Sequence, residues 1–145
     1  MSRRSRAREV ALQVLFQDDL NPGGSPHASD EFLIRRLHVA DPTLGARVPS
    51  EELIAFARSL VSGVRRNREE LDALLARTAE NWRLERMAAT DRNVLRLGAY
   101  EILYADTPGV VAIDEALELA KRYGTAQSAQ FVNGILDRFL EGHSK

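Results

Sequence analysis

Apolar residues recur along the chain with the three-to-four-residue spacing of amphipathic helices, and no stretch shows the two-residue alternation of a strand. The first such stretch predicts a helix over about residues 5–19. Leu12 and Phe16 form a second apolar stripe on it, roughly 100° or more from the main one. This second stripe predicts either a helix clamped between two core layers, which we favour, or an apolar edge offered to a partner. The main stripe consists of Ala7, Val10, Ala11, Val14 and Leu15.

Helix-breaking residues and caps divide the rest of the first half. The Pro/Gly-rich segment 21–26 ends the first helix, and Ser29 is expected to cap a short second helix. A loop over residues 39–49 then precedes a longer helix, for which Ser50 is the expected N-cap. The apolar stripe of this longer helix comprises Leu53, Ala57, Leu60, Val61 and Val64.

The second half continues with helical patterns. Asn67 followed by Glu70 resembles a capping box that restarts the helix. Gly98 lies inside the next predicted helix, where glycine costs about 1 kcal/mol relative to alanine, and it therefore predicts a close helix crossing. Gly124 is expected to end the following helix as a left-handed C-cap. The pattern predicts an all-α fold, with residues 1–145 forming a single domain.

Composition narrows the class of protein. The 145 residues are 44% apolar and 28% charged, which is typical of a globular domain. The chain has no cysteine, which excludes disulfides, thiolate nucleophiles and cysteine-ligated zinc. No apolar run has the length of a membrane span, and no apolar stretch follows the basic N-terminus as in a secretory signal. We therefore expect an intracellular, cytoplasmic protein without a membrane partner.

A basic tract stands at the N-terminus although the net charge is only −1. Residues 1–8 contain four arginines and no acid, and we expect them to form a basic N-terminal arm. Guanidinium groups are permanently charged and donate in a planar fork, so a tract of this kind is suited to binding phosphates. On composition alone, a solvated tail is the favoured interpretation. The four arginines are Arg3, Arg4, Arg6 and Arg8.

The sequence offers no catalytic constellation. His27, His38 and His143 are scattered and lack metal-ligand spacing, and no phosphate-binding or nucleophile motif occurs. The acidic pairs fall in helices or at helix starts, where solvent exposure and the helix dipole account for them. We therefore expect a protein that is not an enzyme and binds neither metal nor cofactor.

Blocks of sequence spread over the whole chain resemble the NusB family of bacterial transcription antitermination factors. The most specific is the C-terminal block, where VVAIDEA (residues 110–116) leads into ELAKRYG (118–124) and FVNGILD (131–137). RARE with ALQVLFQ, within residues 6–17, and DRNVLRLGAYE (91–101) agree in the same order. Residues 20–50 look individual to this chain.

The resemblance implies about seven helices in two packed bundles, a NusB-like fold. Members of the family bind the boxA element of nascent RNA and pair with the ribosomal protein NusE. They act with other Nus factors on the RNA polymerase elongation complex and suppress premature, Rho-dependent termination, chiefly in ribosomal RNA operons. Some members are monomers and others are dimers, so the resemblance leaves a homodimer open.

The resemblance also implies site residues. The four arginines match the arginine-rich RNA-binding N-terminus of the family, and the turn before the last helix supplies further candidates for RNA contact. Among these, Phe131 is either core or a base-stacking platform, with core slightly favoured. Gln127 stands where acidic residues can occur, which suggests stronger RNA binding here. The candidates from this turn and its neighbourhood are Lys121, Gln127, Ser128, Gln130 and Phe131.

For the NusE-binding face, the resemblance points to the second stripe, Leu12 and Phe16, with Asp91 and Glu85 as acidic partners for a basic protein. Two alternatives stay open. One is a helical protein-protein adaptor whose arginines are incidental. The other is the NusB-like domain of a ribosomal RNA methyltransferase, which would require the chain to be a fragment. A DNA-binding helix-turn-helix is disfavoured because no helix shows a cluster of base-reading polar residues.

Overall fold

The computed structural model describes residues 2–40 and 49–143, and these residues form an all-α structure, as predicted. The described residues contain no helix long and apolar enough to cross a bilayer. The chain divides into two compact units, residues 1–62 and 63–145, whereas a single domain stays a prediction. The helices are α1 (Arg3–Leu20), α2 (Pro26–Ala40), α3 (Glu51–Arg66), α4 (Arg68–Ala79), the short 3-10 helix η2 (Leu84–Arg86), α5 (Ala89–Tyr104), α6 (Gly109–Tyr123) and α7 (Ser128–Gly142).

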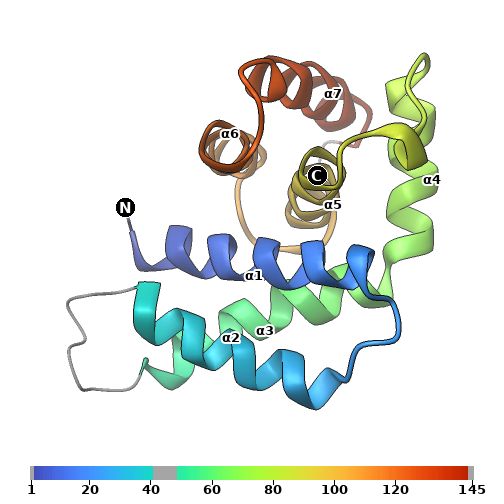
Figure 1. Cartoon of the computed structure of the whole chain (residues 1–145). Helices are drawn as coiled ribbons and strands as arrows, with labels where there is room; N and C mark the ends of the chain where they lie inside the picture. The colour runs from blue at the N-terminus through green and yellow to red at the C-terminus, as the bar shows by residue number, and fades with distance from the viewer. Residues whose placement is uncertain (1, 41–48, 144–145) are drawn as a thin grey trace. The chain divides into compact units, whose positions relative to one another are not determined.

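The first unit consists of α1, α2 and most of α3. Helices α1 and α2 lie side by side (Figure 1). All five residues of the predicted main stripe of α1 are buried, and so are all five of the predicted stripe of α3. The helical spacing of apolar residues therefore identified the buried faces of both helices correctly.

Helix α2 begins at Pro26, three residues before the predicted cap. The Ser25 hydroxyl accepts a hydrogen bond from the Ala28 backbone N–H at 3.3 Å, whereas Ser29 donates its own hydroxyl to the Pro26 carbonyl at 3.1 Å. Proline suits the first helical position because the N–H that it lacks has no partner there. The expectation that Ser29 caps this helix is therefore wrong. Most of the loop over residues 39–49 lies outside the described residues.

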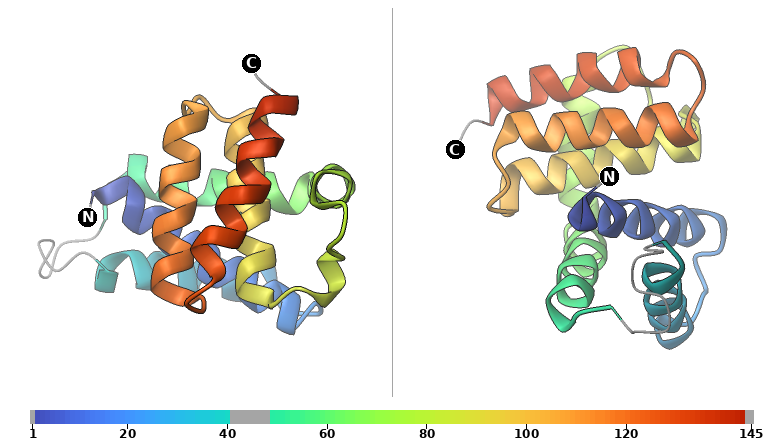
Figure 2. Two further views of the ribbon diagram at one scale, coloured as in Figure 1. Left: turned by 90° about the horizontal axis from the view of Figure 1, so that it is seen from above. Right: turned by 90° about the vertical axis from the view of Figure 1, so that its left-hand side faces the viewer.

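The second unit is built on α5, which packs against α4, α6 and α7. Figure 2 shows α5, α6 and α7 side by side with their axes nearly aligned. Gly98 stands at the crossing of α5 with its neighbours, since a Cβ placed there would lie 2.7 Å from Leu136 Cδ1 and 3.5 Å from the Ala116 Cβ. The predicted close helix crossing at Gly98 is confirmed.

A partly buried ion pair joins α4 to α5. The Arg96 guanidinium donates from Nε to Asp72 Oδ1 at 2.7 Å and from Nη2 to Asp72 Oδ2 at 2.9 Å, and its side chain is 5% exposed. At the start of α4, Asn67 makes no side-chain cap and donates Nδ2 to the Gly63 carbonyl at 2.8 Å. The capping box predicted from Asn67 and Glu70 is therefore wrong.

Candidate nucleic-acid interface

The arginine tract lies on a helix. Ser2 caps α1, because its hydroxyl accepts a hydrogen bond from the Ser5 backbone N–H at 3.0 Å. The helix therefore begins at Arg3, two residues before the predicted start, and residues 3–8 of the expected basic arm lie on its first turns. No acidic side chain stands in the first turn of α1. Cations at the positive end of a helix dipole are unfavourable, so an anion bound there would relieve the repulsion.

The four arginines differ in exposure. Arg3 and Arg4 are exposed, Arg6 is partly buried, and Arg8 is only 4% exposed. The guanidinium carbons of Arg4 and Arg8 lie 4.2 Å and 5.3 Å from the ring centroid of Phe56 on α3. Arg8 is thus the least accessible of the four to a phosphate. Sequence reasoning did not single out Phe56, because its contact with α1 follows from packing between helices far apart in sequence.

A pocket of about 230 Å³ in the second unit brings several predicted site residues together. Trp82 and Phe131 stand at its rim with their ring centroids 5.2 Å apart and their planes at 78°, an edge-to-face pair. Trp82 is 58% exposed. The pocket lining includes Trp82, Arg86, Asp91, Gln127, Ser128 and Phe131.

Phe131 lines this pocket with intermediate exposure, so the choice between a core position, slightly favoured, and a stacking platform stays a prediction. Sequence reasoning missed Trp82 and Arg86. Trp82 is the only tryptophan of the chain and falls between two predicted helices, outside any apolar stripe. An aromatic residue in such a connection has no helix face to bury it, and that is the signal that would have identified it.

The turn before α7 is shaped by Ser128. Its hydroxyl accepts a hydrogen bond from the Thr125 backbone N–H at 2.9 Å, and the residue is 1% exposed, so this oxygen is used inside the turn. Gly124 is extended (φ −93°, ψ −163°) instead of left-handed, so the predicted C-cap conformation is wrong. Glycine is needed for a different reason, since a Cβ at Gly124 would overlap the Ser128 hydroxyl.

The other two candidates on α6 and α7 lie outside the pocket. Lys121 and Gln130 are exposed and neither lines it. The Lys121 ammonium lies 3.7 Å from a carboxylate oxygen of Glu118, in a pair whose side chains are both more than 60% exposed. Such a pair contributes little to stability and leaves the ammonium available to exchange partners.

The predicted protein-binding residues on α1 are more buried than expected for an apolar edge offered to a partner. Leu12 is 3% exposed and Phe16 is partly buried. Leu12 therefore agrees with the core interpretation of the second stripe, and not with an apolar edge.

The acidic candidates are held close to the pocket. Glu85 is exposed on η2, and Asp91 lines the pocket in the first turn of α5. Arg92 fixes η2 to this helix, because Nη1 donates to the Leu84 and Met87 carbonyls at 3.0 and 3.1 Å. One oxygen of Asp91, Oδ1, is buried without a hydrogen-bond partner among the described residues.

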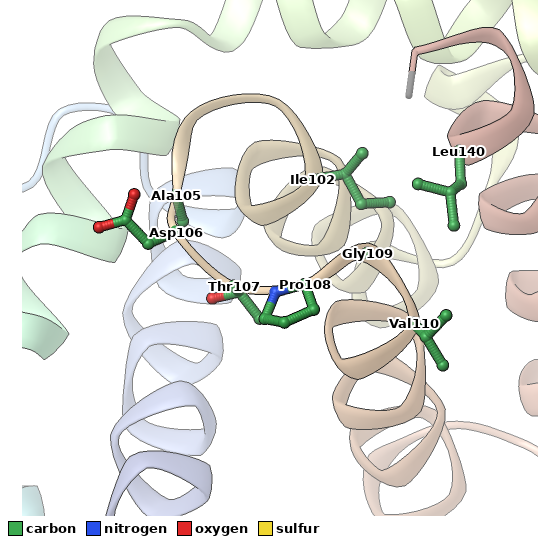
Figure 3. A pocket seen from close by; sticks show the side chains of 8 residues that line it. All are labelled: Ile102, Ala105, Asp106, Thr107, Pro108, Gly109, Val110 and Leu140. Atoms are coloured by element: carbon green, nitrogen blue, oxygen red, sulfur yellow. The ribbon is translucent and has the colours of Figure 1, made fainter. Parts of the chain in front are cut away.

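A larger pocket of about 430 Å³ lies at the turn between α5 and α6 and contains none of the predicted site residues. Figure 3 shows its apolar wall, formed by Ile102, Val110 and Leu140, while the carboxylate of Asp106 points away from them. This pocket brings no group of titratable side chains together, so nothing in it suggests chemistry.

The described residues contain no cluster of three or more histidine, cysteine, aspartate or glutamate side chains that could hold a metal. His27 pairs with Glu31 at 2.9 Å on the exposed face of α2. The His143 ring stacks on Phe139 with centroids 4.4 Å apart, and Nδ1 lies 2.9 Å from the Phe139 carbonyl. Local contacts therefore account for both histidines.

Comparison with known proteins agrees with the fold. The NusB family model matches residues 5–141. A transcription antitermination protein NusB from Symbiobacterium thermophilum is 47% identical over 98% of this chain and 91% of that protein. One from Bdellovibrio bacteriovorus is 40% identical over 99% of this chain and 98% of that protein.

Solved structures agree as well. T. maritima NusB superposes with a TM-score of 0.83 at 38% identity, covering all of this chain and 94% of the other. A structure of the antitermination factors NusB and NusE in complex with double-stranded RNA has the same fold, with a TM-score of 0.78 at 23% identity over 98% of both chains. The family is one of non-catalytic transcription factors, in agreement with the expectation that the chain is not an enzyme. With a family model and relatives that span nearly its full length, the chain belongs to the NusB family of transcription antitermination proteins.

Proposed function

We propose that the chain binds boxA RNA together with NusE and, with other Nus factors on the RNA polymerase elongation complex, suppresses premature Rho-dependent termination, chiefly in ribosomal RNA operons. The observation that carries the proposal is the arginine tract at the start of α1. Three arginines, Arg3, Arg4 and Arg6, retain exposed surface in the first turn of a helix that has no acid in that turn. This placement concentrates positive charge at an end of the helix that already favours anions.

The turn before α7 supports contact with unpaired RNA. Trp82 and Phe131 expose aromatic surface at the rim of a pocket that also contains Arg86 and Gln127. Aromatic side chains stack on unpaired bases, while arginine and amide groups bind phosphates and base edges. Lys121, Ser128 and Gln130 complete the candidate set, with the Ser128 oxygen engaged in shaping the turn.

Binding of a basic protein partner is supported by Glu85 and Asp91, which Arg92 holds on one segment of the second unit. Complementary charge mainly raises the association rate and selects the partner. Leu12 and Phe16 would then contribute to partner binding chiefly by fixing the shape of α1.

The test is binding of a labelled boxA-containing single-stranded RNA, with and without NusE. We expect NusE to tighten binding, and replacement of Arg3, Arg4 and Arg6 by alanine to abolish it. Replacing Arg77, an exposed arginine on α4, by alanine is a control for loss of positive charge outside the tract and should leave binding unchanged. No RNA binding under any condition, by a chain shown to be monomeric by light scattering, would favour the adaptor interpretation.

A second variant tests the turn before α7. Gln127→Asp places a negative charge at the rim of the pocket and should weaken RNA binding about three- to tenfold through repulsion of phosphate. Gln127→Asn is the neutral control and should bind almost as well as the wild type. Equal RNA affinity of the aspartate and asparagine variants would show that this turn is not part of the RNA-binding site.

A further inference from the structure

Two arginines of the tract share a single aromatic partner. Arg4 and Arg8 lie one helical turn apart on the same face of α1, and both guanidinium groups lie over the ring of Phe56 on α3, at 4.2 and 5.3 Å. All three residues belong to the first unit. Separations below about 6 Å are those of attractive cation–π contacts.

Phe56 itself is held by its surroundings. It is partly buried, and two residues further along α3 the Arg58 guanidinium forms a two-pronged ion pair with Asp30 of α2, at 2.8 and 2.7 Å. This pair joins α2 to α3. The Phe56 ring has only two side-chain torsions, so it is a stiffer platform than the arginines above it, which are long side chains with many rotamers.

The two arginines use the platform differently. Arg8 is 4% exposed and has further partners, so its position is set by packing. Arg4 is exposed, and among the described residues no carboxylate pairs with it. The Phe56 ring is thus the contact that orders the Arg4 guanidinium while leaving it accessible from solvent.

We propose that Phe56 is a positioning residue for RNA binding: its ring holds the Arg4 guanidinium so that an unpaired base stacks on the accessible side of that group. Arginine planes stack on bases as aromatic rings do. A free arginine side chain loses much rotamer entropy when it binds, and a guanidinium already held over a ring loses less. This inference rests on the proposed RNA-binding function and assigns Phe56 a part in it.

The test measures affinity for the boxA RNA in a double-mutant cycle. Phe56→Leu should weaken binding about threefold, the size of an exposed cation–π contact, and Phe56→Tyr should restore it because the ring remains. In the Arg4→Ala background, Phe56→Leu should have no further effect. The number of charges that meet RNA does not change, so the salt dependence of binding by Phe56→Leu should equal that of the wild type.

Controls separate this role from a structural one. Phe32→Leu makes the same substitution at another partly buried phenylalanine of the first unit and should leave affinity unchanged. A shallower salt dependence for Phe56→Leu, or an undiminished effect in the Arg4→Ala background, would show general disturbance of α1 and overturn the inference. Equal binding by the wild type and Phe56→Leu would overturn the inference alone. Absence of RNA binding by the wild type would overturn the proposed function, and the inference with it.

Discussion

At the scale of single residues, two glycines near and within α7 have opposite surroundings. A Cβ at Gly124 would lie 2.7 Å from the Ala120 carbonyl oxygen and would overlap the Ser128 hydroxyl. At Gly134, which is exposed inside α7, the same position meets no heavy atom within 4 Å beyond the neighbouring residues and backbone of its own helix. The first glycine is therefore required by close packing, whereas the second has no packing role in the described structure.

These surroundings predict opposite changes in the free energy of unfolding. Gly124→Ala should destabilise the protein by about 1 to 3 kcal/mol, because a backbone oxygen cannot move aside cheaply. Gly134→Ala should stabilise it by up to about 1 kcal/mol, because alanine is the better helix former and meets no neighbour. Urea denaturation with an unchanged m-value measures both. A stabilised Gly124→Ala variant would show that the turn before α7 relaxes freely.

At the scale of elements, the Asp72–Arg96 pair links α4 to α5 through two hydrogen bonds. Asp72→Ala should lower the free energy of unfolding by about 3 kcal/mol, because it leaves a guanidinium that is only 5% exposed without its carboxylate. Asp137→Ala removes an exposed carboxylate from α7 and should change stability by less than about 0.5 kcal/mol. Chemical denaturation measures the free energy of unfolding of both variants. Equal stabilities would mean that water replaces the Asp72 carboxylate at Arg96.

The Asp30–Arg58 pair predicts a pH dependence in the first unit. The hydrogen bond from Arg58 lowers the pKa of Asp30 below its ordinary value of 3.8. A carboxyl whose pKa is lower in the folded state stabilises the fold above its unfolded pKa, and this contribution disappears as the pH falls through the folded pKa. Asp30→Asn should therefore lower the melting temperature at pH 7 and have almost no effect near pH 2. The same shift at both pH values would show that the charge of Asp30 is not what stabilises the fold.

The elements also show which local signals the sequence carried. Ser50 caps α3 as predicted, with its hydroxyl accepting from the Leu53 backbone N–H at 3.2 Å. Ser25 and Ser29 are both able to cap a helix, and Pro26 between them decides in favour of the earlier start. Asn67 failed as a cap because its amide found the Gly63 carbonyl of the preceding helix instead. Cap residues indicate that a helix begins, and competition among nearby polar groups decides where.

At the scale of the whole molecule, the family resemblance implied two packed bundles, but no local signal in the sequence marked where the two units divide. The boundary falls between residues 62 and 63, inside the continuous helix α3, so no linker or change of composition marks it. The candidate sites show the same limit. Blocks of family resemblance located the arginines and the turn before α7, but Phe56 and Trp82 acquire their neighbours only when helices pack. Contacts across helices depend on tertiary structure, which the one-dimensional pattern does not contain.

The charge distribution of the whole chain leads to the last prediction. The net charge is only −1, so attraction to RNA must come from the local tract and not from the molecule's overall charge. Three arginines of the tract have exposed surface: Arg3, Arg4 and Arg6. If each of them contacts or lies close to a phosphate, a plot of the logarithm of the affinity against the logarithm of the salt concentration should have a slope of about −2. Raising the salt concentration from about 50 to 200 mM would then weaken binding about 16-fold.

Single substitutions show which arginines carry this dependence. Arg3→Ala or Arg6→Ala should make the slope shallower by about 0.7, the value expected for loss of one contact to single-stranded RNA. Arg8→Ala should leave the slope unchanged and lower the melting temperature instead, because Arg8 is 4% exposed and packs over Phe56. Arg77→Ala on α4 should change neither quantity. A shallower slope for Arg8→Ala would mean that the Arg8 guanidinium leaves Phe56 and contacts RNA. A shallower slope for Arg77→Ala would mean that RNA affinity depends on charge over the whole surface and not only on the tract.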